Sequence, residues 1–359
     1  EDRRADPTRI AANTNWSREL PKNMHLTLGA SYNSQKTHYF KVIDDLLGGD
    51  FWVDLDQFAS QDSNDPNAAQ NNLSNPNHVV RVGDTFGYDY DMHTNLANVF
   101  GQLEKKWHKL DGYVGLTLSQ TTFWRDGHYQ KALFPETSYG DSPKQNFTHG
   151  GIKAGAVYKL SGRNYITANV AYLTMAPTTN SAFLSARTRD ALVDGLTNEK
   201  DFSSDISYEV RLPRVTGRAT LYYATTADGV WSRSFYHDVY QTYVNYSMTG
   251  VGTLHEGAEL AAQVKLSPTW EATAVLAAGE YLYNSRPSAT VTRDNSDTAL
   301  ATDRTVYWKN FRVGGIPQKA ASIGLRYSAP QYWSLGANLN WFGDIYLDPN
   351  PDRRTAEAV

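Results

Sequence analysis

Apolar and polar residues alternate one by one along most of this chain, and this period of two constrains its fold more than any other feature. In the clearest run, one face carries Trp333, Leu335, Ala337, Leu339 and Trp341, and the other carries Ser334, Gly336, Asn338 and Asn340. Similar alternation recurs within residues 26–33, 166–172 and 260–266. Because such alternation is typical of β-strands with two different faces, the sequence predicts an all-β protein with about twelve strands paired as hairpins.

The connections between the expected strands alternate between short and long. Short connections, marked by turn-forming residues such as Pro21, Gly162 and Pro268, fall near residues 18–23, 106–109, 160–163, 212–216, 267–269 and 328–332. Long polar stretches cover residues 44–87, 129–146, 177–202 and 285–305. Long loops are uncommon within compact domains and are usually functional or disordered. Their place on every second connection predicts an up-and-down antiparallel meander whose long loops emerge at one end.

Such a meander can be a membrane barrel or a soluble sandwich or propeller, and the two differ in whether lipid or a packed core covers the apolar faces. The mean hydropathy is −0.54 and no run of about 18 apolar residues occurs, which excludes a transmembrane helix. Trp333 and Trp341 lie about 26 Å apart along a strand at ~3.3 Å per residue. A strand tilted by ~40° then spans ~20 Å, close to the ~25 Å apolar band of transmembrane barrels. Together with the polar opposite faces, this spacing favours a membrane barrel with a wet lumen over a soluble sandwich or propeller.

Composition and motifs exclude several functions. The 34 Lys and Arg nearly balance the 38 Asp and Glu, which argues against nucleic acid as a partner. The chain has no cysteine, so disulfides and thiolate metal sites are excluded. It shows no nucleophile elbow, phosphate loop or zinc-protease motif and no signal-peptide pattern. The sequence therefore predicts no enzyme, no catalytic residues and no cofactor.

Three stretches resemble a known family. Residues 165–190 read YITANVAYLTMAPTTNSAFLSARTRD, residues 253–260 read TLHEGAEL, and residues 313–355 read VGGIPQKAASIGLRYSAPQYWSLGANLNWFGDIYLDPNPDRRT. Together they resemble the C-terminal barrel of TonB-dependent outer-membrane receptors of Gram-negative bacteria. The resemblance is closest to receptors with an N-terminal carboxypeptidase-regulatory-like domain.

The resemblance implies a transmembrane antiparallel up-and-down barrel of 22 strands, closed by a plug domain. About twelve strands would leave such a barrel open, and an open edge in lipid leaves backbone groups unsatisfied. We therefore expect residues 1–359 to be a partial outer-membrane β-barrel domain, with short periplasmic turns and long extracellular loops. The plug and the TonB box are not in this chain.

The implied function is TonB-dependent active import of a scarce solute, which the resemblance limits only to an iron chelate, cobalamin, a glycan or a peptide. The expected partners are outer-membrane lipid, the TonB complex through segments absent here, a small-molecule or oligomeric nutrient and a possible surface lipoprotein. Two alternatives stay open: a passive porin-like channel or structural outer-membrane barrel, and a soluble sugar-binding β protein.

Ligands reach a receptor of this kind from outside the cell, so aromatic and charged residues near the long loops are the candidate ligand contacts. They are Trp52, Tyr88, Tyr90, Trp124, Arg125, Trp231, Tyr236 and Trp308. Flat aromatic faces suit sugars or hydrophobic siderophores, and an arginine suits a carboxylate or a ferric-chelate anion. The alternative is that these residues form an aromatic girdle or pack the loops together.

Two further groups have other interpretations. Loop aspartates 54, 56, 62 and 65 offer oxygen ligands for Ca²⁺, although their spacing matches no EF-hand and we expect no metal. The Asp89–His93 stretch and His255-Glu256 read first as lumen-facing or loop-exposed polar residues. Arg187 and Arg189, which follow Phe183-Leu184, are expected to fix a loop and not to bind substrate.

Overall fold

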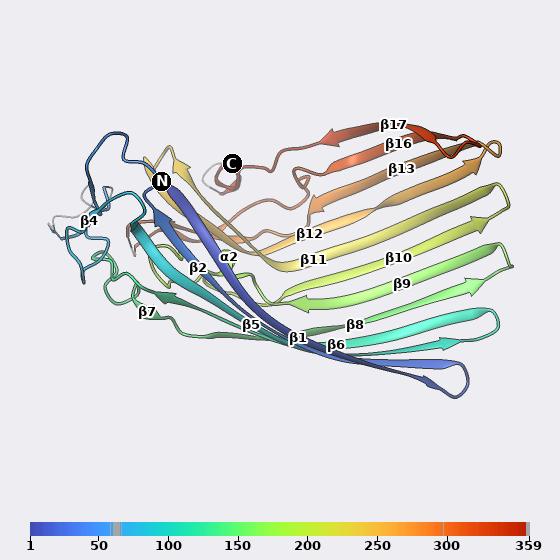
Figure 1. Ribbon diagram of the computed structural model, residues 1–359, viewed down its shortest axis with the longest axis horizontal. Coiled ribbons are helices and arrows are strands. Elements are labelled where there is room, and N and C mark those ends of the chain that lie inside the picture. Colours follow the sequence, from blue (N-terminus) through green and yellow to red (C-terminus); the bar gives the residue numbers. More distant parts are fainter. Residues whose placement is uncertain (58, 60–64, 66, 297, 357–359) are drawn as a thin grey trace.

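The computed structural model describes residues 1–57, 59, 65, 67–296 and 298–356, which form a long, curved antiparallel sheet (Figure 1). The strands of its main path are β1 (Asp2–Leu20), β2 (Met24–Val42), β5 (Thr85–Lys106), β6 (Leu110–Gly127), β8 (Gln145–Lys159), β9 (Asn164–Met175), β10 (Glu199–Arg211), β11 (Val215–His237), β12 (Thr242–Lys265), β13 (Trp270–Tyr283), β16 (Pro317–Ser328) and β17 (Ser334–Ile345). The short elements are β3 (Trp52–Val53), β4 (Val79–Val80), β7 (Gly140–Asp141), α2 (Thr179–Ala182), β14 (Ser288–Arg293), β15 (Ala299–Thr305) and the 3₁₀ turn η1 (Pro351–Arg354).

Each strand of the main path pairs with its neighbours along the chain, so the sheet is an up-and-down meander with β1 and β17 at its two edges. Six tight turns lie at one end, which we call the turn end (Figure 1). In the first turn, residues 21–23, Lys22 and Asn23 have φ of 64° and 57°, the left-handed backbone region that occurs in tight hairpin turns. The long connections emerge at the opposite end, which we call the loop end. The predicted meander is confirmed.

One connection at the loop end differs from the expected plan. β11 and β12 have 23 and 24 residues and are joined by only four residues, 238–241, so this hairpin extends as a strand pair past its neighbours. Within the long connection between β13 and β16, β14 pairs with residues 244–249 of β12, and β15 pairs with β14. A small sheet of four strands therefore continues the main sheet at the loop end.

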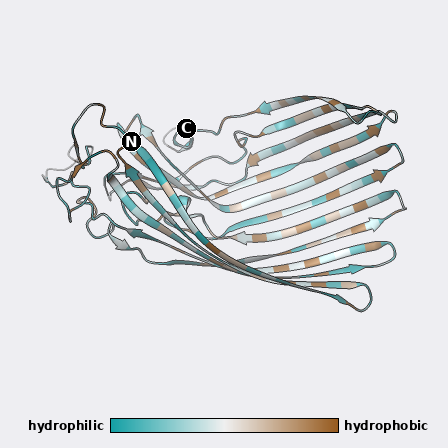
Figure 2. Cartoon of the chain, viewed as in Figure 1, coloured by the Kyte–Doolittle hydropathy of each residue, from teal (hydrophilic) through white to brown (hydrophobic). Residues whose placement is uncertain are grey.

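The two faces of the main sheet have different chemistry. Paired residues share a face, and the register of Leu325 with Ala337 and of Ile323 with Leu339 places apolar side chains in rows across the strands. Figure 2 shows the resulting alternation of hydrophobic and hydrophilic segments. We call these the apolar face and the polar face. Leu339 on the apolar face is 72% exposed, and a continuous exposed apolar surface of this kind indicates contact with lipid or another apolar partner.

Most of the buried hydrophobic residues gather in three clusters at the loop end and not between layers of the main sheet. The wall of the sheet is held instead by its continuous backbone ladder, which pairs all 19 residues of β1 with β2. Among the described residues, no helix is long and apolar enough to cross a membrane.

Candidate functional site

The long connections at the loop end pack onto one another and onto the polar face of the sheet. The 176–198 loop, which contains α2, lies against β5 and β6. Ala182 and Phe183 of this loop are buried with Tyr90, Met92 and Phe123, and the rings of Phe123 and Phe183 meet edge to face at 6.1 Å. Tyr90 and Met92 lie on the polar face of β5, since they pair with residues of the Arg125 side of β6. Asp89 and Asp91 alternate with them and lie on the apolar face. The loop therefore covers part of the polar side of the wall.

Asp294 joins this loop to the four-stranded extension. Its carboxylate accepts hydrogen bonds from Ser185 Oγ at 2.6 Å, Arg187 Nη2 at 2.6 Å and Asn245 Nδ2 at 3.1 Å. Burial alone would raise the pKa of Asp294, but the charge of Arg187 and these hydrogen bonds outweigh it and hold the pKa below its ordinary value. Arg187 therefore fixes a loop, as the sequence predicts.

Arg189 makes a second set of contacts between the same segments. Its guanidinium donates to the carbonyl oxygens of Asp294 and Ser296 at 3.2 and 3.1 Å and lies 4.4 Å from the ring centre of Phe134. Phe134 belongs to the 128–144 loop, so Arg189 contacts two neighbouring connections at once. This geometry agrees with the predicted role of Arg189 in fixing a loop.

Lys131 holds the 128–144 loop against the 43–84 loop. Its ammonium group is buried and donates to Asn71 Oδ1 and to the Gly87 carbonyl, both at 2.7 Å. Asp54 accepts from Asn71 Nδ2 at 2.7 Å and from the Gly87 amide at 2.9 Å. Burial lowers the pKa of Lys131 to about 8, against the opposing charges of Asp56 and Asp54. Each long loop at this end thus contacts the next one through a buried charged side chain.

The four-stranded extension has its own hydrophobic core. Trp308 is fully buried among Tyr246, Val291 and Val306, with Trp231 packed against the cluster at its side. The last described segment closes this core, since the Tyr307 amide donates to the Arg354 carbonyl at 2.7 Å. The four-stranded extension thus has a packed core of its own beside the loops.

The eight candidate ligand contacts lie in different surroundings: some are exposed, and others are buried within the packed loops. Trp52 on β3 and Tyr236 near the tip of the β11–β12 hairpin are exposed, and Tyr236 meets Tyr243 edge to face at 5.7 Å. Trp124 lies on the apolar face, where it stacks on His93 at 4.5 Å with Lys144 over its ring. That position is typical of an aromatic girdle.

The other candidates are within the loop packing. Arg125 is buried, donates to the carbonyl oxygens of Ala186 at 2.6 Å and Ser138 at 2.8 Å, and lies 5.1 Å from the ring centre of Tyr90. Tyr88 is half-buried beside Tyr90, at 6.0 Å between ring centres. Trp231 and Trp308 meet edge to face at 5.9 Å. The structure therefore brings together Tyr88, Tyr90 and Arg125 in one cluster and Trp231 and Trp308 in another.

A band of polar side chains crosses the polar face of the wall below the loops. Asn169 accepts from the Tyr113 hydroxyl at 3.3 Å and donates to Asp205 at 3.1 Å. Tyr222 and Tyr281 share a hydrogen bond of 2.7 Å further along the sheet. Such a surface, hydrogen-bonded but not dry, suits a water-filled lumen.

The groups of side chains that could hold a metal ion differ from the loop aspartates considered in the sequence. Among the described residues, the groups of three or more whose ligand atoms lie close enough for one ion are His38, Asp89 and His128, and Asp91, Asp126 and His128. Neither includes the loop aspartates, and Asp62 lies outside the described residues. The sequence marked the Asp89–His93 stretch but missed His38 and His128, which strand pairing brings to it. His255 and Glu256 alternate on β12 and so face opposite sides.

No protein-family model matches this chain, and no curated protein matches it. Solved structures of transporters and receptors do match it. The copper transporter OprC aligns with a TM-score of 0.65 at 14% identity, over 94% of this chain and 43% of OprC. The ferric-catecholate import receptor Fiu from E. coli K12 aligns at 0.58 and 14%, over 94% and 44%, and the siderophore receptor PiuA from Acinetobacter baumannii at 0.59 and 12%, over 94% and 46%.

These comparisons define a fold, the barrel wall of transporters and receptors. This chain has the fold of the barrel part of TonB-dependent receptors and spans less than half the length of the three proteins. The predicted fold class, an antiparallel β-barrel type, is confirmed. The neighbours are transporters and receptors, not enzymes.

Proposed function

We propose that this chain is part of an outer-membrane receptor that imports a scarce solute by TonB-dependent active transport. One observation carries the proposal: the 176–198 loop is folded onto the polar face of the wall and is fixed there by Asp294 and Arg125. Loops fastened together over the polar side narrow the lumen and form a surface that can capture a ligand.

In this account the apolar face of the sheet contacts lipid, and the polar face lines the lumen. The loop end faces outside the cell, and the turn end faces the periplasm. Residues 1–359 then form a partial barrel domain, and the other strands, the plug and the TonB box are supplied by segments outside this stretch. The resemblance to receptors with a carboxypeptidase-regulatory-like domain makes such a domain part of the proposal.

The substrate class that we favour is a metal ion or metal chelate. The structural neighbours named above are a copper transporter, a ferric-catecholate receptor and a siderophore receptor. Cobalamin, a glycan or a peptide would use the same architecture. Among the candidate contacts, Trp52 and Tyr236 are exposed enough to meet a ligand first, and a surface lipoprotein could cover the same loops.

Uptake and conductance of the complete receptor test this proposal together. Cells that depend on it should accumulate a radiolabelled ferric chelate, and removal of TonB should abolish that accumulation. The purified receptor should give little steady current in a planar bilayer. Uptake without TonB, together with large steady currents, would instead favour the passive porin-like channel. A full gene without a plug and TonB box would contradict the proposal outright.

A further inference from the structure

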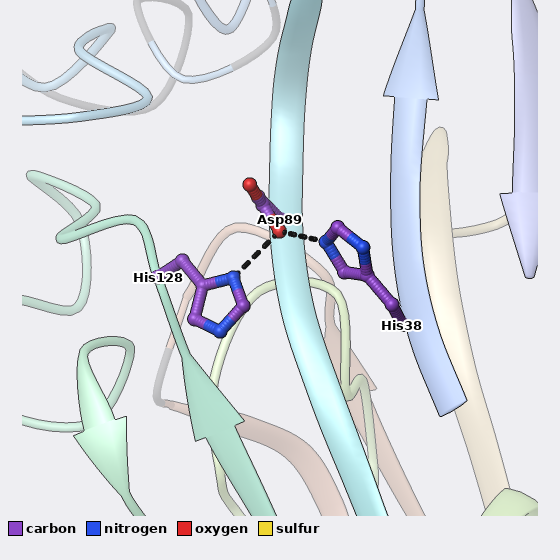
Figure 3. A group of neighbouring side chains, drawn as sticks. All are labelled: His38, Asp89 and His128. Atoms are coloured by element: carbon purple, nitrogen blue, oxygen red, sulfur yellow. Dashed lines mark hydrogen bonds and ion pairs between the residues drawn. The ribbon is translucent and has the colours of Figure 1, made fainter. Parts of the chain in front are cut away.

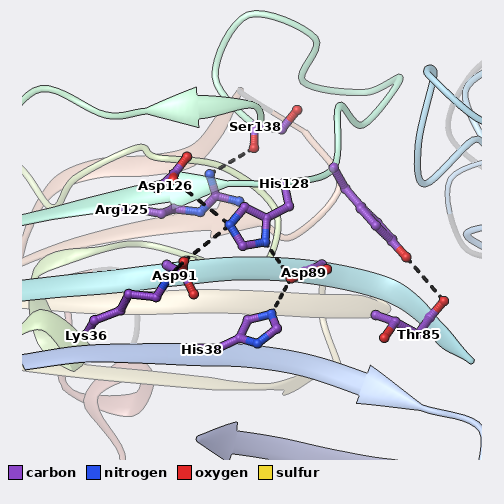
Figure 4. A network of polar contacts seen from close by, with 10 residues as sticks. Lys36, His38, Thr85, Asp89, Asp91, Arg125, Asp126, His128 and Ser138 are labelled. Atoms are coloured by element: carbon purple, nitrogen blue, oxygen red, sulfur yellow. Dashed lines mark hydrogen bonds and ion pairs between the residues drawn. The ribbon is translucent and has the colours of Figure 1, made fainter. Parts of the chain in front are cut away.

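A cluster of titratable side chains lies on the apolar face, beyond Trp124 toward the loop end. Its members come from β2, β5, β6 and the residue that follows β6 (Figure 4). They are Lys36, His38, Asp89, Asp91, Asp126 and His128. The cluster faces away from the polar side, where the loops pack, so the proposed import function does not use it.

Two imidazole rings converge on one carboxylate oxygen at the centre of this cluster (Figure 3). His38 Nε2 lies 2.6 Å and His128 Nδ1 lies 2.8 Å from Asp89 Oδ1. The three ligand atoms of these residues all lie within 4.8 Å of one another. Zinc binds imidazole and carboxylate at about 2.0–2.2 Å, with neighbouring ligands about 3.3 Å apart. An ion could therefore replace the shared hydrogen bonds after a small separation of the side chains.

The residues around this centre are those that a metal-bound histidine needs. A metal-ligating imidazole generally donates its second N–H to a carboxylate. His128 Nε2 lies 3.4 Å from Asp91 Oδ2 and 3.9 Å from Asp126 Oδ2. The cluster lies beyond Trp124 of the aromatic girdle and so outside the lipid-covered band in the proposed account. The His38 and His128 side chains are about one-third exposed there, so water can reach the centre and supply a further ligand.

The cluster also has an excess of negative charge. Three carboxylates face a single ammonium group, that of Lys36, which lies 2.5 Å from Asp91 Oδ2. With neutral imidazoles the excess is two charges, which one divalent ion would cancel. Asp91 is 3% exposed, and its Oδ1 has no hydrogen-bond partner among the described residues. Lys36 compensates Oδ2, whereas a buried carboxylate oxygen such as Oδ1 is costly when no donor or cation meets it.

The geometry points to a binding site for a divalent transition-metal ion of the zinc class, with His38, Asp89 and His128 as ligands and Asp91 orienting His128. The ion would join β2, β5 and the base of the 128–144 loop on the outer side of the wall. Because Lys131 holds the same loop from the other side, metal binding would fix the position from which the loop network is built.

Calorimetric titration of the untagged full-length protein with Zn²⁺, after chelator treatment, tests the site. We expect one equivalent to bind, and we expect the affinity to fall at least about tenfold in His38→Gln, His128→Gln and Asp91→Asn, as for loss of a supporting carboxylate. Glutamine keeps a side-chain hydrogen-bond donor for the Asp89 carboxylate, so we expect these variants to fold. His108→Gln, in an exposed turn, is the matched control and should bind as the parent does. Unchanged stoichiometry and affinity in the His38→Gln, His128→Gln double variant would overturn the proposal.

Electron paramagnetic resonance with Cu²⁺ as a probe identifies the ligands directly. The parent protein should show nitrogen splitting from two imidazoles, and each single histidine variant should show splitting from one. A spectrum with oxygen ligands alone, or the same two-nitrogen spectrum in both variants, would overturn the assignment even if the protein binds Zn²⁺.

Discussion

The wall of the sheet and its loop end are built by different rules. Side chains on the apolar face of the wall are exposed, and the wall is held by a backbone ladder that runs from β1 to β17. At the loop end, buried hydrophobic clusters and buried charged groups hold the structure together, as in the core of a globular protein. The stability of the wall therefore depends on the solvents at its two faces, whereas the stability of the loop end depends on individual side chains.

The largest expected effect of a single substitution is therefore in the loop-end core. Trp308→Ala removes a fully buried ring and should destabilise the four-stranded extension by about 3–5 kcal/mol. Hydrogen exchange at the amides of β14 would measure this local loss. Leu339→Ala, on the apolar face of β17, is the matched wall variant.

Leu339 is exposed in the chain, so its truncation leaves no cavity in the protein, and we expect a change below about 1 kcal/mol. Equal losses for Trp308→Ala and Leu339→Ala would break the comparison, because the wall would then hold a packed core of its own.

Loss of the Asp294 carboxylate should have the next largest effect. Asp294→Ala leaves Arg187 and Asn245 without their acceptor and should cost about 2–3 kcal/mol, less than for a fully buried pair because Arg187 is partly exposed. Faster proteolysis of the 176–198 loop would report it. Lys200→Ala, which breaks an exposed pair with Asp228, should change cleavage little. Equal cleavage rates in the two variants would contradict the role of Asp294.

A smaller effect is expected where the wall is crowded. A Cβ added at Gly257 would lie 2.5 Å from the Ala278 carbonyl oxygen and 2.6 Å from the Tyr222 hydroxyl, so Gly257→Ala should cost about 1–2 kcal/mol. Gly162, in a tight turn, has open space around it, and Gly162→Ala is the control. Denaturant unfolding of the two variants in detergent should differ; identical midpoints would show that the backbone ladder tolerates the added methyl group.

The most gradual expected effect is a pH dependence at Lys131. Its pKa of about 8 in the folded chain lies below the value of an unfolded lysine, so the unfolded chain binds the proton more tightly. Stability should therefore rise as the pH increases from about 8 to about 10.4, by at most about 1.4 kcal/mol per pH unit. Protease cleavage of the 128–144 loop should slow over this range, and Lys131→Met should remove the dependence. A cleavage rate of the parent protein that does not change with pH would contradict the lowered pKa of Lys131.

The sequence predicts the wall well because the wall is a local structure. Alternation within one strand and turn residues such as Pro21 and Gly162 involve neighbours only, and both survive in the structure. The same local pattern cannot tell where strands stop at the loop end. It therefore did not show that residues 238–241 would be a tight turn between two extended strands.

The loop end was less predictable because its contacts join distant residues. Arg125 was expected to meet a ligand anion, yet it binds carbonyl oxygens 13 and 61 residues away and is buried by them. Asp294 contacts a loop more than 100 residues earlier. The His38–Asp89 contact needed the register of β2 with β5, which alternation alone does not give. Whether the eight candidate residues contact ligand stays a prediction.

Cysteine scanning along β12 tests the central claim, that membrane lipid covers one face of this sheet and water the other. The chain has no cysteine of its own, and residues 259–263 are all exposed in the isolated chain, so burial within the chain cannot cause a difference. In the full-length protein in liposomes, a water-soluble maleimide should label cysteines at positions 259, 261 and 263 and leave those at 260 and 262 unlabelled. Equal labelling at all five positions would contradict the account.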